Sequence, residues 1–288
     1  MTKWLVLFGV IVFLCIVEWI REIVTFKVTH YDIQSDKLNK LIHERKIVFL
    51  TDLHNNSYGT NNEKLLASVR EQNPDLILVG GDMLVGKPEA STKIAEEFVK
   101  KLTEICPVYY ANGNHEQRMK IYPEKFGTKY QEYKTSVEQS GVQFLENEHI
   151  DLVFDACPIQ IHGLEIPREG YKKFGKTNVS LEQIEERIGK ADSSKYQILL
   201  AHNPIYADTY LEWGADLILS GHLHGGIVRL PGLGGVITPQ FRLFPKYSGE
   251  LTVKDGKSVV VSKGLGTHTI KIRFLNPAEM VVLHLQGK

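Results

Sequence analysis

The stretch ADLILSGHLHGG, residues 215–226, joins a continuous apolar run to two histidines set two residues apart. The run ADLIL is not a strict alternation of apolar and polar residues, which favours a strand buried on both faces. His222 and His224 follow where this run stops. The glycine before them permits a sharp turn, and the two glycines after them leave open space beside the imidazoles. The stretch therefore predicts a buried strand that delivers two candidate ligands at its carboxyl end.

The same arrangement recurs along the chain. The apolar runs are KIVFL (46–50), DLILV (75–79), PVYYA (107–111), YQILLA (196–201) and ADLIL (215–219). Stretches with helical character lie at 62–71, 91–105, 129–140, 180–190 and 206–213. Ser180 followed three residues later by Gln183 is typical of a capping box at a helix start. Strands that alternate with helices predict an α/β fold built in layers.

Each of the five runs is followed by side chains that commonly bind metal ions. These are Asp52, His54, Asp82, Asn114, His115, His202, His222 and His224. Because ligands bind at the carboxyl ends of strands in open α/β sheets, we expect these side chains to converge on one edge. Each motif alone fits an ordinary turn. Five of the eleven histidines of the chain fall at these strand ends, however, so chance is a poor explanation for the whole set.

Composition limits the kinds of site and partner. The three cysteines, at 15, 106 and 157, have no CxxC spacing, which predicts neither a disulfide framework nor a thiolate metal site. Imidazole, carboxylate and amide ligands suit two divalent ions chosen from Mn, Zn, Fe and Co. Two such ions about 3.5–4 Å apart form a clamp for displacement at phosphorus. Lys and Arg equal Asp and Glu at 34 each, so we expect no nucleic-acid partner.

The N-terminus differs from the rest of the chain. Residues 4–17, WLVLFGVIVFLCIV, contain no polar residue, and tryptophans at 4 and 19 bracket the segment. We expect residues 1–24 to be a single-pass anchor in the cell membrane, with the remaining chain extracytoplasmic. The flanking positive charges are nearly balanced, so the side rests on a short Lys-bearing head that resembles an export signal-anchor. A buried core helix is one alternative, and a cleaved signal peptide, for which no small-x-small site follows, is another.

The five motifs TDLH, GGD, GNHE, AHNP and SGHLHGG, in this order and spacing, resemble those of the calcineurin-like metallophosphoesterases. The resemblance covers residue 46 to the C-terminus. It implies a four-layer αββα sandwich of two mixed sheets, following the N-terminal transmembrane helix. We expect residues 25–45 to form a linker or edge strand and residues 46–288 to form the metallophosphoesterase domain.

The resemblance also implies a role for each motif residue. One metal ion would be bound by Asp52, His54 and His224, and the other by Asn114, His202 and His222, with Asp82 bridging the two. A metal-bridging hydroxide would attack phosphorus, and His115 would stabilise the transition state or protonate the leaving oxygen. The family often has a second acid three residues after the bridging one, where this chain has Val85.

Three later segments, together with the anchor, resemble the bacterial membrane-anchored branch of this family. They are FPKYSGE (244–250), VSKGLGTH (261–268) and IRFLNPAEMVVLHL (272–285). The branch implies hydrolysis of phosphodiester or pyrophosphate bonds in phosphorylated small-molecule, lipid-linked or cell-envelope substrates. Arg229, Lys263 and His268 are candidate groups on the substrate side. A protein Ser/Thr-type phosphomonoesterase and a non-catalytic metal-binding scaffold are the alternatives, and the intact ligand set weighs against the scaffold.

Overall fold

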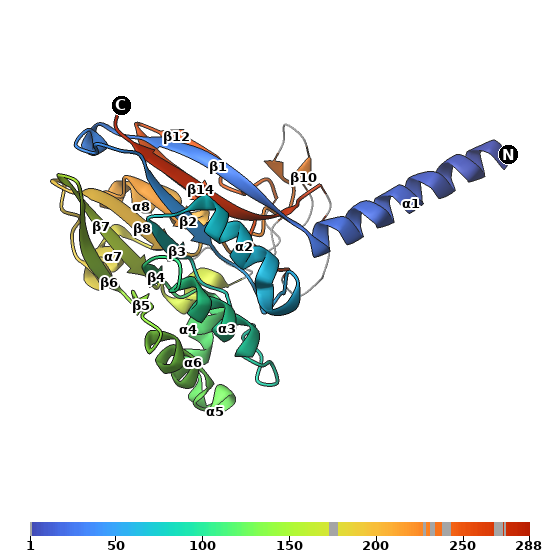
Figure 1. Cartoon of the computed structure of the whole chain (residues 1–288), viewed down its shortest axis with the longest axis horizontal. Helices are drawn as coiled ribbons and strands as arrows, with labels where there is room; N and C mark the ends of the chain where they lie inside the picture. The colour runs from blue at the N-terminus through green and yellow to red at the C-terminus, as the bar shows by residue number, and fades with distance from the viewer. Residues whose placement is uncertain are drawn as a thin grey trace.

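The computed structural model describes residues 2–172, 178–226, 229–230, 234–237, 243–267, 273 and 275–288. A long helix, α1 (Thr2–Val24), extends away from the body of the molecule, which holds two six-stranded sheets with helices outside them (Figure 1). His268, a candidate group on the substrate side, lies outside the described residues.

The first sheet combines strands from both ends of the chain. Its order is β1 (Phe26–Gln34), β14 (Ala278–Gln286), β2 (Arg45–Leu50), β3 (Leu76–Val79), β4 (Val108–Tyr110) and β5 (Gln143–Phe144). All neighbours are parallel except β14 and β2, so the sheet is mixed. Strand β1 lies within residues 25–45, and it forms the outer edge of this sheet by pairing with β14.

The second sheet is also mixed. Its order is β12 (Leu251–Lys254), β13 (Lys257–Val261), β9 (Leu217–Ser220), β8 (Tyr196–Ala201), β7 (Cys157–Leu164) and β6 (Glu148–Phe154). The four inner strands are parallel, and the two outer strands pair antiparallel. A separate short pair is formed by β10 (Arg229–Leu230) and β11 (Gly234–Gly235).

Three apolar clusters separate four layers. The cluster between the two sheets includes Phe49 of the first sheet and Ile198 of the second. The helices that pack beside the first sheet are α2 (Glu63–Gln72), α3 (Lys93–Leu102), α4 (Asn114–Ile121), α5 (Pro123–Phe126) and α6 (Lys129–Glu138). Those that pack beside the second sheet are α7 (Leu181–Ile188) and α8 (Ala207–Trp213). Short 3₁₀ helices occur at η1 (Asp36–Leu38), η2 (Thr60–Asn62), η3 (Arg168–Tyr171) and η4 (Pro204–Tyr206). The predicted αββα sandwich is confirmed.

Local signals in the sequence account for most elements. The continuous apolar runs form strands with both faces buried, as β3 and β8 show. The capping box at α7 is present: Ser180 Oγ accepts the N–H of Gln183 at 3.3 Å, and Gln183 Oε1 accepts the N–H of Ser180 at 3.1 Å. The sequence did not indicate α4, which begins at Asn114 within the GNHE motif.

Helix α1 is the one described helix that is long and apolar enough to cross a membrane. The span is Lys3–Val24, with a mean hydropathy of 2.2. Its side chains are largely exposed, but Glu22 is only 1% exposed because the last turn of the helix packs against the domain. A single residue, Thr25, separates α1 from β1.

The core between the sheets gives a test of this packing. Phe49 is fully buried there, so Phe49→Ala is expected to lower the free energy of unfolding by about 3–5 kcal/mol through lost contacts and a cavity. Urea unfolding of the full-length protein in detergent, followed by tryptophan fluorescence, measures this. Val253→Ala is the control, since this β12 side chain is 63% exposed. Similar unfolding of the two variants would contradict the assignment of Phe49 to the core.

Candidate metal centre

The candidate ligands of the first sheet are held by pairing that continues past the strands. The N–H of Asp52 donates to the carbonyl of Gly81 at 2.9 Å, and that of His54 donates to the carbonyl of Asp82 at 3.1 Å. The turn after β2 therefore runs beside the turn after β3. This places Asp52 and His54 next to Asp82.

Three of the candidate histidines, His202, His222 and His224, come from the second sheet, which corrects the expectation of a single sheet edge. His202 follows β8, and its Nδ1 lies 2.7 Å from the carbonyl of Gly80 in the first sheet. The N–H of His222, after β9, donates to both carboxylate oxygens of Asp52, at 3.2 and 3.1 Å. The site thus lies where the carboxyl ends of two facing sheets meet.

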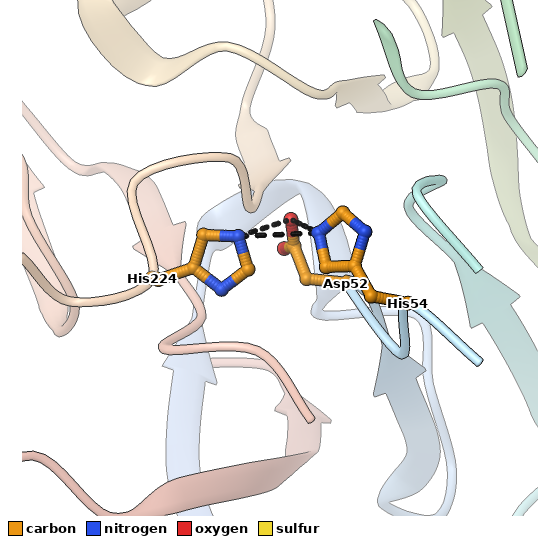
Figure 2. Close-up of side chains that lie close together, drawn as sticks. All are labelled: Asp52, His54 and His224. Carbon is orange, nitrogen blue, oxygen red and sulfur yellow. Dashed lines mark hydrogen bonds and ion pairs between the residues drawn. The ribbon is translucent and has the colours of Figure 1, made fainter. Parts of the chain in front are cut away.

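One group of possible ligands consists of Asp52, His54 and His224 (Figure 2). The Nε2 atoms of His54 and His224 lie 3.7 and 3.5 Å from Asp52 Oδ1. The same two nitrogens are 3.2 Å apart, and their rings stack at a centroid separation of 5.0 Å. Both rings therefore direct Nε2 at one carboxylate, an arrangement that can hold a cation.

A second group consists of Asp82, His202 and His222. Asp82 Oδ2 is 3.2 Å from His202 Nε2 and 3.8 Å from His54 Nε2. Asp82 therefore lies between the two groups. The Nδ1 of His202 faces a backbone carbonyl, which leaves its Nε2 as the donor atom for a metal.

Asn114 and His115 occupy the first turn of α4. Asn114 Oδ1 is buried and accepts no hydrogen bond from the described residues, as expected of an oxygen oriented toward a cation. The N–H of His115 donates to Asp82 Oδ1 at 2.8 Å, and its Nε2 lies 3.8 Å from Asp82 Oδ2. A third group, formed by His54, Asp82 and His115, brings His115 to the same cluster.

The backbone of the candidate ligands is strained. Five of them have left-handed φ values, at Asp52 (55°), His54 (48°), Asp82 (52°), His222 (67°) and His224 (50°). Such conformations are uncommon for residues other than glycine and cost of the order of 1–3 kcal/mol each. Strain concentrated at these positions indicates that the site, more than local stability, determines the shape of the turns.

Glycines allow the loops to approach the carboxylates closely. A Cβ at Gly113 would lie 2.2 Å from Asp82 Oδ1, and one at Gly221 would lie 2.1 Å from Asp52 Oδ2. The open space expected at Gly225 is occupied, because a Cβ there would meet Asn276 Oδ1 at 2.3 Å. The sequence interpretation of this glycine was therefore wrong, since Gly225 accommodates a protein side chain.

Burial and neighbouring charges shift the pKa values of the centre in opposite directions. Burial alone would raise the pKa of Asp52, but the charges of His224 and His202 lower it below its usual range. Burial likewise opposes ionisation of Asp82, and the charge of His202 lowers its pKa well below the usual value. Burial would lower the pKa of His202, yet the two carboxylates raise it to about 10. The centre therefore contains two carboxylate anions that attract positive charge.

Glu116 supports the ligand loops from outside the three ligand groups. It is fully buried, and its carboxylate accepts the N–H groups of Asp82 at 2.8 Å, Leu84 at 3.0 Å and Gly113 at 3.1 Å. The hydroxyl of Tyr110 donates to it at 3.0 Å. Burial, and then the charge of Asp82, raise the pKa of Glu116 to about 7. The position of Glu116 directly after His115 is consistent with a group that hydrogen-bonds behind the ligands, but the sequence alone does not indicate its three backbone partners.

The other sequence candidates lie in separate interactions. Arg229 pairs with Glu250, and Lys263 Nζ lies 2.6 Å from Glu279 Oε2, so both charges are compensated within the protein. His162, in the middle of β7, lies outside the three ligand groups, and its Nε2 is 3.0 Å from both Gln160 Oε1 and Gln197 Oε1. Its ring also packs against Trp213 of α8, on the side of the second sheet away from the site.

The donor set fits a divalent metal centre, and with the αββα sandwich it defines a metallophosphoesterase. Its nitrogen and oxygen donors, without thiolate, suit the borderline divalent cations. The chain belongs to the calcineurin-like phosphoesterase family, whose model matches residues 45–226. It is therefore a phosphoester hydrolase with His and Asp clusters able to hold metal ions.

Three relatives illustrate the similarity. The chain is 26% identical over 243 residues to an uncharacterized protein of Bacillus subtilis strain 168, covering 84% of this chain and 81% of that protein. It is 31% identical over 270 residues to an uncharacterized metallophosphoesterase of Campylobacter jejuni, covering 92% and 64%. It is 24% identical over 270 residues to a Danio rerio transmembrane protein with a metallophosphoesterase domain, covering 90% and 57%. The chain spans less than two thirds of the latter two proteins.

The support from Glu116 can be tested by metal binding. Glu116→Ala removes the acceptor shared by three backbone N–H groups, so we expect the affinity for Mn²⁺ to fall about 10–100-fold. Titration calorimetry of the full-length protein, without substrate, measures this affinity. Glu97→Ala, an exposed position on α3, should bind as wild type. An unchanged affinity in the Glu116 variant would refute the supporting role.

Proposed function

We propose that this chain is a membrane-anchored phosphoesterase with two divalent metal ions, which hydrolyses phosphodiester or pyrophosphate bonds. The observation that carries the proposal is the pair of ligand groups with Asp82 between them. Asp52, His54 and His224 would hold one ion, and Asn114, His202 and His222 the other, with Asp82 contacting both. When bound, two ions of Mn, Zn, Fe or Co would activate water and neutralise charge on a phosphoryl group.

We propose that His115 stabilises the transition state by donating a hydrogen bond from Nε2 to the leaving oxygen. The backbone N–H of Gly86 donates to its Nδ1 at 2.7 Å. A backbone amide can only donate, so Nδ1 must accept and the neutral ring carries its proton on Nε2. Its Nε2 atom lies among the candidate ligands, 3.8 Å from Asp82 Oδ2. The backbone amide that follows Val85 therefore orients this ring.

Two arginines support a substrate with an additional anionic group. Arg168 donates to the carbonyl of Asn114 at 2.9 Å, and Arg118 donates to that of Gly86. Burial, and next the charge of Arg168, lower the pKa of Arg118, as expected of neighbouring guanidinium groups. Neither forms an ion pair with a carboxylate in the described part of the chain. Their remaining donors suit a second phosphate, which favours a pyrophosphate substrate.

The position of α1 supports a lipid-linked substrate. We propose that the helix spans the cell membrane once, with the catalytic domain extracytoplasmic. Only Thr25 separates α1 from β1, and Glu22 packs into the domain, so the domain would lie close to the bilayer surface. A phosphate at the headgroup level of a lipid or cell-envelope precursor would then be near the metal centre. A protein Ser/Thr-type phosphomonoesterase and a non-catalytic scaffold are the competing functions.

The catalytic proposal is tested with bis-p-nitrophenyl phosphate and Mn²⁺, using the full-length protein in detergent. We expect His115→Ala to lower kcat about 10²–10³-fold, because the hydrogen bond that stabilises the transition state is lost. Asp82→Asn should lower Mn²⁺ affinity as well, since the carboxylate contacts both ligand groups. Wild-type turnover no greater than that of these variants would support the scaffold instead. A strong preference for phosphopeptides would support the protein phosphatase.

The substrate proposal needs a panel of four compounds: a diester and a pyrophosphate, each as a soluble short-chain form and as a lipid form in vesicles. We expect the lipid pyrophosphate to have the highest kcat/KM. Arg168→Ala should raise KM for both pyrophosphates about tenfold or more, with less effect on the diesters. Arg187→Ala on the exposed face of α7 is the control. Equal kcat/KM for lipid and soluble forms would contradict the lipid assignment.

A further inference from the structure

The last turn of α1 contributes a buried carboxylate to the catalytic domain. Glu22 is 1% exposed, although it belongs to a helix whose side chains are otherwise exposed or half-buried. Its Oε1 accepts the backbone N–H of Asn276 at 2.9 Å. Burial of a carboxylate is unfavourable unless hydrogen bonds compensate it, so a buried Glu in an apolar helix indicates a specific contact.

Asn276 connects this contact to the turn that carries His224. Its side-chain amide donates to the carbonyl of His224 at 2.7 Å and to that of Gly226 at 2.6 Å. Asn276 is 1% exposed and fills the space where Gly225 lacks a Cβ. The glycine between the two carbonyls and the asparagine therefore fit one another. Two hydrogen-bonded steps link Glu22 to the backbone of a candidate metal ligand.

Arg273 holds the other side of the same segment. Its guanidinium is 2% exposed and donates to the carbonyl of Asn276 at 3.1 Å. It also donates to the carbonyls of Lys263 at 2.8 Å and Gly266 at 2.5 Å. The carbonyl of Gly266 lies 3.3 Å from His224 Nδ1. The backbone and the ring of His224 are thus both held by groups that meet around Asn276.

We propose that Glu22 is a positioning residue for the metal ligand His224, so that the end of the membrane helix is a part of the metal centre's scaffold. The inference rests on the proposed metal centre. Glu22 fixes the backbone at Asn276, whose amide then fixes the carbonyls on both sides of Gly225. Loss of the acceptor at residue 22 would leave a buried N–H unsatisfied and release the turn.

The test uses the full-length protein in lipid nanodiscs and measures Mn²⁺ binding by calorimetry, without substrate. Glu22→Ala should weaken the more affected Mn²⁺ site about tenfold or more, the range found when groups behind a ligand are removed. Glu22→Gln keeps an acceptor of the same length, so it should restore affinity to within about threefold. Glu18→Ala is the matched control, one turn earlier on α1, where the carboxylate binds Arg21 near the surface.

A second variant keeps the test decisive if Glu22→Ala does not fold. Glu22→Asp retains the charge but withdraws the acceptor by one methylene, so we expect weaker Mn²⁺ binding than in Glu22→Gln. Electron paramagnetic resonance of bound Mn²⁺ should change in Glu22→Asp and match wild type in Glu22→Gln. Wild-type affinity in both Ala and Asp variants, or an equal loss in Glu18→Ala, would overturn the proposal.

Metal binding also separates this inference from the proposed function. Mn²⁺ bound by wild type and weakened by Glu22→Ala, without turnover of any phosphoester, would support the positioning role and refute the proposed catalysis. Turnover of a phosphoester by the wild type, together with unchanged Mn²⁺ binding in Glu22→Ala, would support the proposed catalysis and refute the positioning role. Failure of the wild-type protein to bind Mn²⁺ at all would overturn both.

Discussion

The structure depends on the burial of two carboxylates, Asp52 and Asp82, which are 0% and 1% exposed at the junction of the two sheets. Buried carboxylates are tolerated only where positive charge and hydrogen-bond donors surround them. Here the imidazoles of both sheets and the backbone N–H groups of His115 and His222 do so. The left-handed turns and close glycine contacts follow from this requirement, because they bring the donors within reach.

Two buried side chains stabilise the centre from outside it, and both act on backbone groups. Glu116 gathers the N–H groups of the Asp82 and Gly113 loops in the first sheet. Asn276 gathers the carbonyls of the His224 turn in the second sheet. Glu116 acts as an acceptor because its loops present N–H groups, and Asn276 acts as a donor because its turn presents carbonyl groups. Together they hold the facing loops at the separation that the shared carboxylates need.

The strands, the helices outside them and the convergence of the motif residues were predictable from local pattern. Continuous apolar runs indicate strands buried on both faces, and polar residues after them indicate a site at their carboxyl ends. Other features were not predictable. The first turn of α4 is held by Asp82 from another strand end, whose Oδ1 accepts the N–H of His115. The occupied space at Gly225 depends on Asn276, which lies far along the sequence.

The sequence by itself determined the kinds of donor in the centre and the strand that delivers each, because both are local properties of residue type and periodicity. Only the tertiary structure decided that the turns of two facing sheets, instead of one edge, supply the ligands. It also decided that Glu22 reaches the His224 turn through Asn276. These contacts join residues that are distant in the sequence, by 254 positions for Glu22 and Asn276. Burial and hydrogen bonding across the folded chain select them, and no local spacing indicates them.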